Sequence, residues 1–309
     1  MPSDPMLLTA NQPGPPIGTA SEFDASKARK QSTLIRQRFF RHKLAVTSLI
    51  VFLLIVAFGM IGPLFWGISV DDSSGGRFEP PSAEHPLGTN QIGKDMLAQL
   101  MRGTRLSVQI ALTVAVLATL VGVTLGALAG YLRGFVDTAI SRVIDLMLII
   151  PAIAVAGILV KAFSGSWYVV ALVLASFGWM SIARITRGET LSLSQREFIE
   201  AASASGATTR WVIFRHLVPN MVGSITVNAT LAIALAVLSE AALSFIGLGV
   251  QIPDTSLGLI ISENYAQITT RPWLFWGPFV VIVALSLCVN FIGDGLRDAF
   301  DPRQTKVRA

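Results

Sequence analysis

Long apolar runs constrain this chain more than any other feature of its sequence. A bilayer is crossed by roughly 20 apolar residues in a helix, and six runs reach that scale, at about residues 44–66, 106–130, 140–163, 168–185, 221–248 and 274–293. Only 14% of the residues are charged, against about 25% in a typical soluble domain, and the mean hydropathy is +0.61. The sequence therefore predicts an all-α integral membrane protein with six transmembrane helices.

The polar stretches divide the chain into four parts. We expect a basic tail over residues 1–43, a first transmembrane helix with an outer loop over 44–105, a core of five spans over 106–303, and a short tail over 304–309. The first apolar run starts some forty residues into the chain and exceeds the length of a signal-peptide core. We therefore expect this run to remain as a membrane span.

The basic residues predict the orientation. Eighteen of the 24 Lys and Arg residues fall in segments that share one side of the membrane if the N-terminus lies inside. Because Lys and Arg accumulate in cytoplasmic loops, we expect both termini and the loop at 194–217 to be cytoplasmic. We also expect the chain to reside in the inner or plasma membrane as a multi-pass protein.

Several function classes find no support in the sequence. The single cysteine, Cys288, lies in an apolar run, which favours a buried hydrophobe over a nucleophile. The three histidines lack metal-ligand spacing, and no Gly-rich phosphate loop of the G-x4-G-K-[ST] type occurs. The basic residues lie beside the spans and form no aromatic-interleaved face, so we expect no nucleic-acid partner. No catalytic constellation and no metal site are predicted.

One polar stretch between two spans has a distinctive order, EAASASGATTRWVIFRHLVPN at residues 200–220. Glu200, Ala201 and Ala202 are good helix formers, and Gly206 suits a helix end or sharp turn. Upstream, SQRE at residues 194–197 has the spacing of a capping box. The pattern predicts a helix, a glycine turn, a second short helix and then Pro219 at the opening of the next span.

At these residues the chain resembles the inner-membrane permease subunits of ABC importers. Their EAA loop is a two-helix coupling element that docks on a separate ATPase subunit, and their fold is the type I, MetI-like permease fold. The resemblance implies a coupling role for Glu200, Ala201, Ala202, Gly206, Arg215 and Pro219. Glu200 is expected to meet the ATPase; stabilisation of the helix N-terminus is the alternative role for this carboxylate.

Three further stretches narrow the family. HPLGTN at 85–90 with GKD at 93–95, SEAALSFIGLG at 239–249, and GDGLRDA at 293–299 with DPR at 301–303 are similar to blocks of the dipeptide/oligopeptide/nickel permeases, specifically the second, C-type subunit. Asn90 and Lys94 depart from the family's usual Asp and Arg. The stretch DTSLG at 254–258 replaces a common Pro-x-Trp-Gly, which leaves the docking of a substrate-binding protein open.

The resemblance implies partners and a transport role. The chain would pair with a homologous permease subunit and bind two ATP-binding subunits. An extracytoplasmic substrate-binding protein would also bind, and residues 67–105 and 250–273 are the segments expected to contact it. ATP and Mg²⁺ would be bound by the ATPase subunits, so we expect no cofactor and no enzymatic activity on this chain. Peptides are the expected cargo; nickel chelates or other small solutes are the alternative. The alternative function classes are a stand-alone channel, a secondary carrier and a scaffold protein. None of these needs a docking loop for an ATPase.

Polar groups inside the spans suggest a second kind of site. An ionised carboxylate at mid-bilayer costs roughly 2.5 kcal/mol or more, so Glu240 should face a pathway or hydrogen-bond between helices. We expect Asn228 to line a pathway or to bond across helices, and Asp145 to pair with Arg142. Glycines at positions 122, 126 and 130 form a small-residue stripe, which favours packing within the subunit over an interface between subunits.

Overall fold

A computed structural model describes residues 31–300 of the chain. Across these residues the regular structure is helical, apart from one isolated bridge between Thr89 and Asp95. The helices are α1 Gln31–Arg41, α2 Lys43–Met60, α3 Gly62–Phe65, α4 Met96–Leu132, α5 Gly134–Ile149, α6 Ala152–Ala162, α7 Trp167–Leu193, α8 Glu197–Ala204, α9 Thr209–Val212, α10 Val218–Asn220, α11 Val222–Phe245, α12 Leu257–Asn264 and α13 Pro272–Phe300. A π-helical turn covers Ile213–Leu217, and a 3₁₀ turn covers Tyr265–Gln267.

The expected tail over residues 1–43 is described only from residue 31. The first 30 residues, the DPR block at 301–303 and the expected tail at 304–309 lie outside the described residues.

Five of the described helices are long and apolar enough to cross a membrane, namely α2, α4, α7, α11 and α13. The span expected at 140–163 is bent. Its residues form α5 and α6, which are joined with a bend of 86°, and the described residues hold six spans if this pair counts as one. The break lies at Ile150 and Pro151, which have extended backbones. Proline disfavours the helical conformation of the preceding residue and lacks the N–H that the helix needs.

The second span begins earlier than its apolar run. α4 starts at Met96, where Asp95 caps it by accepting a hydrogen bond from the Ala98 N–H at 2.7 Å, so the helix begins before the span expected from residue 106. The polar side chains between Met96 and Arg105 concealed this first part of the helix. With 37 residues, α4 is about 55 Å long, and its ends extend beyond a hydrocarbon core of roughly 30 Å.

The small-residue stripe lies between α4 and α7. A Cβ atom added at Gly122, Gly126 or Gly130 would stand 2.5–2.7 Å from a backbone oxygen of α7. The absence of side chains therefore allows the two helices to approach backbone to backbone. This confirms the predicted packing within the subunit.

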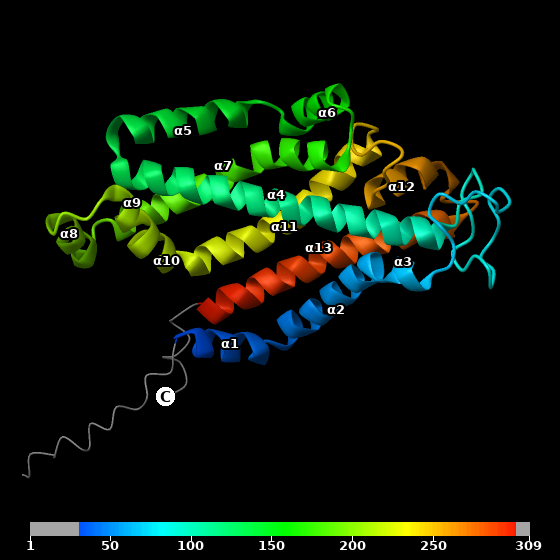
Figure 1. The fold of residues 1–309 in the computed structure, drawn as a ribbon, viewed down its shortest axis with the longest axis horizontal. Helices are drawn as coiled ribbons and strands as arrows, with labels where there is room; N and C mark the ends of the chain where they lie inside the picture. The colour runs from blue at the N-terminus through cyan, green and yellow to red at the C-terminus, as the bar shows by residue number, and fades with distance from the viewer. Residues whose placement is uncertain (1–30, 301–309) are drawn as a thin grey trace, which may run out of the picture.

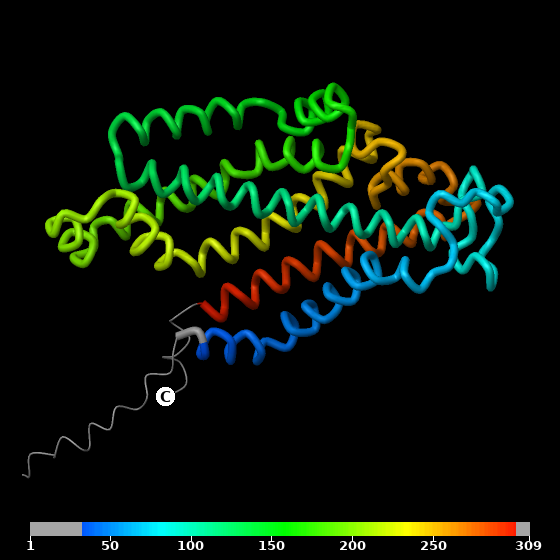
Figure 2. Tube along the Cα trace, viewed as in Figure 1, coloured from blue at the N-terminus to red at the C-terminus, as the bar shows by residue number. Residues whose placement is uncertain are grey.

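The two ends of the bundle differ in character (Figure 1). The loop at 66–95, which we call the outer loop after the side on which the sequence predicts it, and α12 lie at one end, on the right of the view, whereas α8 and α9 lie at the other. Figure 2 shows the same path as a tube, in which the start of α1 and the end of α13 lie toward the end that carries α8 to α10. Phe39 of α1 and Ala299 of α13 belong to one apolar cluster.

Candidate functional site

The polar stretch before α11 folds as two short helices around a glycine turn. Gly206 has φ +82°, a conformation that glycine adopts without the steric cost of a Cβ. The N–H of Gly206 bonds the carbonyl of Ser203, and the N–H of Ala207 bonds that of Ala202, which closes the end of α8. Thr208 then caps α9. The predicted order of helix, glycine turn and helix is confirmed. We call residues 197–220 the coupling segment, after the role that the sequence resemblance implies for them.

The start of α8 differs from the capping box that the sequence predicts. Arg196 is the capping residue and makes no side-chain cap bond. Ser194 instead terminates α7: its hydroxyl donates to the Leu191 carbonyl at 3.0 Å and accepts from Arg133 at 3.1 Å. Because α7 continues to Leu193, Ser194 is used at the end of that helix.

The inward side of the coupling segment is apolar and fixed to α4. Ile199, Val212, Ile213, Leu217 and Met221 are 0–3% exposed, and they pack with Ala127 near the end of α4. Tyr131 of α4 adds a hydroxyl contact of 3.2 Å to Ser203. The segment is therefore a packed extension of α4 and not a loose loop.

Its outward side carries most of the residues that the sequence singled out. Glu200, Ala201, Gly206, Arg215 and Pro219 are exposed, and Ala202 is half-buried. All six lie within this one segment.

Sequence reasoning missed the aromatic part of the same surface. Phe198, Trp211 and Phe214 are 44%, 48% and 58% exposed, and the rings of Phe198 and Trp211 flank His216 at 6.2 and 4.6 Å. The signal was present as three large apolar residues in a polar stretch between spans. Aromatic residues and arginine are enriched at protein interfaces.

A cavity of about 330 Å³ lies between α4, α6, α7 and α11. Its lining is mainly apolar, with polar groups from Ser181, Asn228 and Ser239. Of the two roles considered for Asn228, the bond across helices is not what the structure has: its amide donates to the Ser224 carbonyl of its own helix at 2.9 Å, since a short polar side chain reaches the carbonyl one turn back.

Glu240 lies elsewhere on the same helix. It is 1% exposed and accepts hydrogen bonds from Ser107 of α4 at 3.0 Å and from Ser244 at 2.7 Å. Twelve residues separate it from Asn228, or about 18 Å along a helix. The two polar residues therefore do not share one site, and of the two roles considered for Glu240 the structure has the bond between helices.

Two carboxylates fasten α5 to α7. The predicted partner of Asp145 is wrong, because its carboxylate lies 2.7 Å from Arg184 of α7 and not beside Arg142. Asp137 bonds Arg187 in the same way, at 2.8 Å for one oxygen. Sequence proximity pointed to a partner on the same helix, whereas folding placed the α7 arginines opposite.

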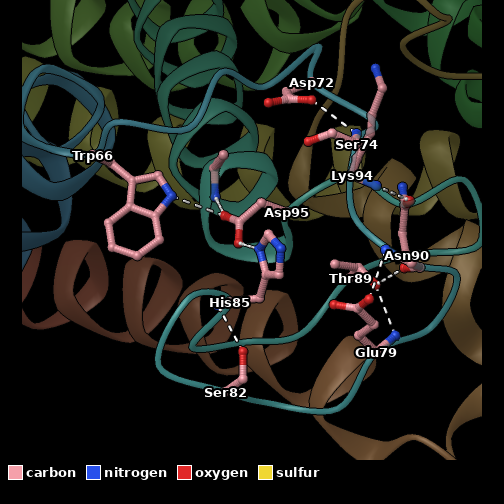
Figure 3. Close-up of polar contacts among 12 residues, drawn as sticks. Trp66, Asp72, Ser74, Glu79, Ser82, His85, Thr89, Asn90, Lys94 and Asp95 are labelled. Carbon is pink, nitrogen blue, oxygen red and sulfur yellow. Dashed lines mark hydrogen bonds and ion pairs between the residues drawn. The ribbon is translucent and has the colours of Figure 1, made fainter.

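The HPLGTN block organises the outer loop (Figure 3). Asp95 accepts from the Trp66 indole at 3.1 Å and contacts Nδ1 of His85 at 2.9 Å, in addition to capping α4. His85 and Asp95 are 7% and 1% exposed. One buried carboxylate thus ties the end of α3, the loop and the start of α4 together.

The departures from the family pattern have local partners. Asn90 accepts from the N–H groups of Ile92 and Lys94 at 3.0 and 2.9 Å, as a short turn requires. The Lys94 ammonium lies 3.4 Å from Asp71. Asp254 lies 3.6 Å from Arg102, which attaches its stretch to α4.

Known proteins are similar in sequence to most of this chain. Residues 122–306 match the family described as binding-protein-dependent transport system inner membrane component, and residues 31–81 match the N-terminal TM domain of oligopeptide transport permease C. The oligopeptide transport system permease protein OppC of Mycobacterium tuberculosis (strain ATCC 25618 / H37Rv) is 40% identical over 279 residues, which cover 89% of this chain and 96% of that protein. The proteins of the same name from Escherichia coli (strain K12) and Bacillus subtilis (strain 168) are 39% and 33% identical, and cover 87% and 93% of this chain and 90% and 96% of their own length.

Proposed function

Because the chain belongs to the family of binding-protein-dependent transport system inner membrane components, we propose that it is a permease subunit of an ATP-driven importer of oligopeptides. It forms half of the translocation pathway and couples to ATPase subunits through residues 197–220. The peptide cargo follows from the relatives named for oligopeptide transport, which match nearly the full chain.

The observation that carries this proposal is the two-faced character of the coupling segment: one face is exposed, and the other is packed against the bundle. The coupling segment presents Glu200, Arg215 and three aromatic side chains to solvent, while its apolar side is buried against α4. A carboxylate in the first turn of α8 is available to an arginine of a partner. Such a segment suits an ATPase subunit that must bind its exposed face and transmit a movement to the helices.

The packing supports a route for that push. Displacement of the coupling segment acts on α4 through the buried cluster around Ile199, and on α11 through α10. α4 and α7 meet along the glycine stripe with little room to slide, so we expect them to move together. Closure of the ATPase pair would then change the angle of α11 against α4 and α7, as alternating access requires.

The cavity between these helices is the part of this subunit that supports a pathway role. Asn228 offers one polar group in a mostly apolar lining, and the lining comes from the helices that the coupling segment would move. A homologous second permease subunit would complete the pathway. A peptide, with its many amide groups, would meet few strong partners on this subunit and could leave again.

The remaining partners follow from the same family. Two ATP-binding subunits, which bind ATP and Mg²⁺, would sit on the coupling segment from the cytoplasm. An extracytoplasmic substrate-binding protein would dock at the opposite end, where the outer loop and α12 lie. Both termini would be cytoplasmic, and this chain itself would hold no cofactor.

The test joins purification with uptake. The complex is purified from native membranes through a tag on this chain and its subunits are identified by mass spectrometry; uptake of labelled oligopeptides is measured in the same cells. We expect a second permease and ATPase subunits to co-purify. Recovery of the chain alone would favour a channel or carrier over an importer subunit. Uptake of nickel chelates without uptake of peptides would show that nickel chelates, and not oligopeptides, are the cargo.

A matched pair of variants tests the docking surface. Glu200→Arg reverses a charge on the coupling segment, whereas Gln91→Arg adds the same side chain to an exposed position of the outer loop. Glu200→Arg should abolish ATPase co-purification and uptake while membrane insertion is unchanged, and Gln91→Arg should retain the ATPase. Normal uptake by Glu200→Arg would refute the docking role.

A further inference from the structure

The segment between α11 and α12 is held at its far end by a buried polar network. Residues 246–256 connect the two helices, and the residues Val250, Ser256 and Leu257 are 0% exposed. A buried backbone N–H needs an acceptor, and the acceptors here are serine side chains. The N–H of Val250 donates to Ser244 at 3.3 Å, and the N–H of Leu257 donates to Ser107 at 3.1 Å.

Glu240 accepts the hydroxyl protons of these two serines. Each serine has one proton to donate, and Ser107 and Ser244 both donate theirs to the Glu240 carboxyl group. Their lone pairs therefore remain free to accept from the two backbone N–H groups. The carboxyl group, which accepts on both oxygens, sets the direction of every bond in the network.

A third serine extends the network to the start of α12. Ser256 accepts from the Leu259 N–H at 3.1 Å, as a helix cap, and donates its proton to Ser244 at 3.3 Å. Three backbone N–H groups are thus satisfied through hydroxyl groups that end at one carboxyl group. Hydrogen bonds connected in this way strengthen one another.

Two glycines allow the segment to come this close. A Cβ at Gly249 would stand 2.1 Å from the Ser244 oxygen, and one at Gly258 would stand 2.6 Å from Cα of Ala241. Larger residues would separate the segment from α11 and break the serine bonds. The close approach and the polar network therefore depend on each other.

The same segment also contacts the outer end of the bent helix pair. The Gln251 N–H donates to the Gly165 carbonyl at 2.9 Å, and Leu248 packs so closely on Gly157 that a Cβ there would lie 2.6 Å from its side chain. Ala156, next to Gly157, lines the cavity. The segment thus joins α6, one wall of the cavity, to α4 and α11.

We infer that Glu240 is a positioning residue for transport: through Ser107 and Ser244 it fixes the segment 246–257, and the segment fixes α6 at the outer end of the cavity. The role in transport rests on the proposed function. The fixing of the segment does not, and it is tested separately.

The first experiment measures hydrogen–deuterium exchange of single amides, by mass spectrometry with electron-transfer fragmentation, on the full chain in nanodiscs with its co-purified subunits. In Glu240→Gln the side-chain amide has one acceptor oxygen in place of two, so one serine loses its acceptor. The amide of Val250 or Leu257 should then exchange about tenfold faster, as expected for the loss of one hydrogen bond.

Two serine variants locate the effect. Ser107→Ala should accelerate exchange at Leu257 and not at Val250, and Ser244→Ala should accelerate Val250 and not Leu257. Asn228→Ala, a polar deletion on the same helix outside the network, should change neither amide. Unchanged exchange at both amides in all three network variants, or faster exchange along the whole of α4 and α11, would overturn the inference.

The second experiment measures peptide uptake by the reconstituted complex. Glu240→Gln should lower the maximal rate about tenfold, in line with the same lost bond, while the dependence on binding-protein concentration and the amount of co-purified ATPase stay as in the parent. A normal maximal rate together with altered exchange would refute the transport role alone. Absence of peptide uptake by the parent complex would instead count against the proposed function.

Discussion

Single polar side chains determine how the ends of the helices are held. Asp95 caps α4 and at the same time receives the indole of Trp66 and the ring of His85. Asp72 of the same loop is exposed and accepts hydrogen bonds from Ser74, with the backbone N–H at 2.9 Å. The two aspartates therefore provide a matched comparison of buried and exposed carboxylates.

We expect Asp95→Ala to lower the free energy of unfolding by about 2–4 kcal/mol, because a helix cap is lost and the half-buried indole of Trp66 and the buried ring of His85 lose their partner. Asp72→Ala should change it by less than about 0.5 kcal/mol, as at other exposed sites. The thermal unfolding midpoints of the two purified variants measure the difference. Equal midpoints would show that the outer loop does not depend on Asp95.

Gly206 tests the turn of the coupling segment. A Cβ there meets no atom within 4 Å, so the cost of Gly206→Ala arises from the backbone at φ +82° and should be about 1 kcal/mol. Gly206→Asn should recover part of this cost, because asparagine tolerates the left-handed region. Co-purification of ATPase subunits should decrease in the order Gly, Asn, Ala; an alanine variant that binds like the parent would contradict the role of the turn.

The residues show where sequence reasoning reached its limit. The turn at Gly206 was predictable because it depends on local backbone chemistry. The partner of Asp145 and the orientation of Asn228 were not, since they depend on which face of α5 or α11 meets α7 or the cavity. The sequence contains the aromatic residues around Trp211, but it does not show that their rings are exposed. Their exposure follows from the burial of Ile199 and Val212 beneath them.

At the scale of elements, α4 and α7 pack backbone to backbone, and glycine is the reason. A Cβ at Gly126 would stand 2.5 Å from the Ala183 carbonyl oxygen, whereas one at Gly188 of α7 would meet nothing within 4 Å. Backbone atoms cannot move aside as a flexible side chain can, so α4 and α7 must separate to admit even one methyl group.

The same substitution at these two glycines should therefore have opposite outcomes. Gly126→Ala should destabilise the protein by about 1–3 kcal/mol through overpacking. Gly188→Ala should be neutral or stabilising by up to about 1 kcal/mol, because alanine favours a helix over glycine. Size-exclusion profiles after stepwise heating in detergent rank the variants. A Gly126→Ala variant as stable as Gly188→Ala would contradict the close packing of the pair.

The coupling segment makes a prediction that separates binding from stability. Trp211→Ala removes an exposed ring, so its thermal midpoint should stay near that of the parent, while affinity for the ATPase should fall about tenfold or more, as for aromatic residues central to interfaces. Tyr265→Ala, at the opposite end of the bundle and 56% exposed, serves as the control. Equal ATPase recovery from both variants would remove Trp211 from the docking surface.

The elements also explain which boundaries were predictable. Apolar runs locate α2, α7, α11 and α13 because lipid requires uniformly apolar surfaces. The first turns of α4 carry polar residues, such as Gln99, which bonds the outer loop at Val70, and Arg102, which pairs with Asp254. The bend between α5 and α6 lies inside a continuous apolar run. Hydropathy cannot distinguish a bent pair from a straight span.

At the scale of the whole molecule, the number of crossings depends on that bent pair. Three elements separate the outer loop from the coupling segment: α4, the α5–α6 pair and α7. If the pair crosses the membrane, residues 92 and 205 lie on opposite sides; if it re-enters on one side, they lie on the same side. The opposite placement of the outer loop and α8 in the bundle favours a crossing (Figure 1).

Labelling with a membrane-impermeant maleimide decides between these topologies and fixes the orientation. Ile92→Cys and Ser205→Cys each place a thiol at an exposed position, and the native Cys288 is buried, so the parent chain measures the background. We expect intact cells to label Ile92→Cys alone and inside-out vesicles to label Ser205→Cys alone, as the excess of basic residues near the coupling segment predicts. Labelling of both thiols from one side would show that α5 and α6 re-enter and that the chain has five crossings. The reverse pattern would keep the six crossings and place the coupling segment outside, where no cytoplasmic ATPase could reach it.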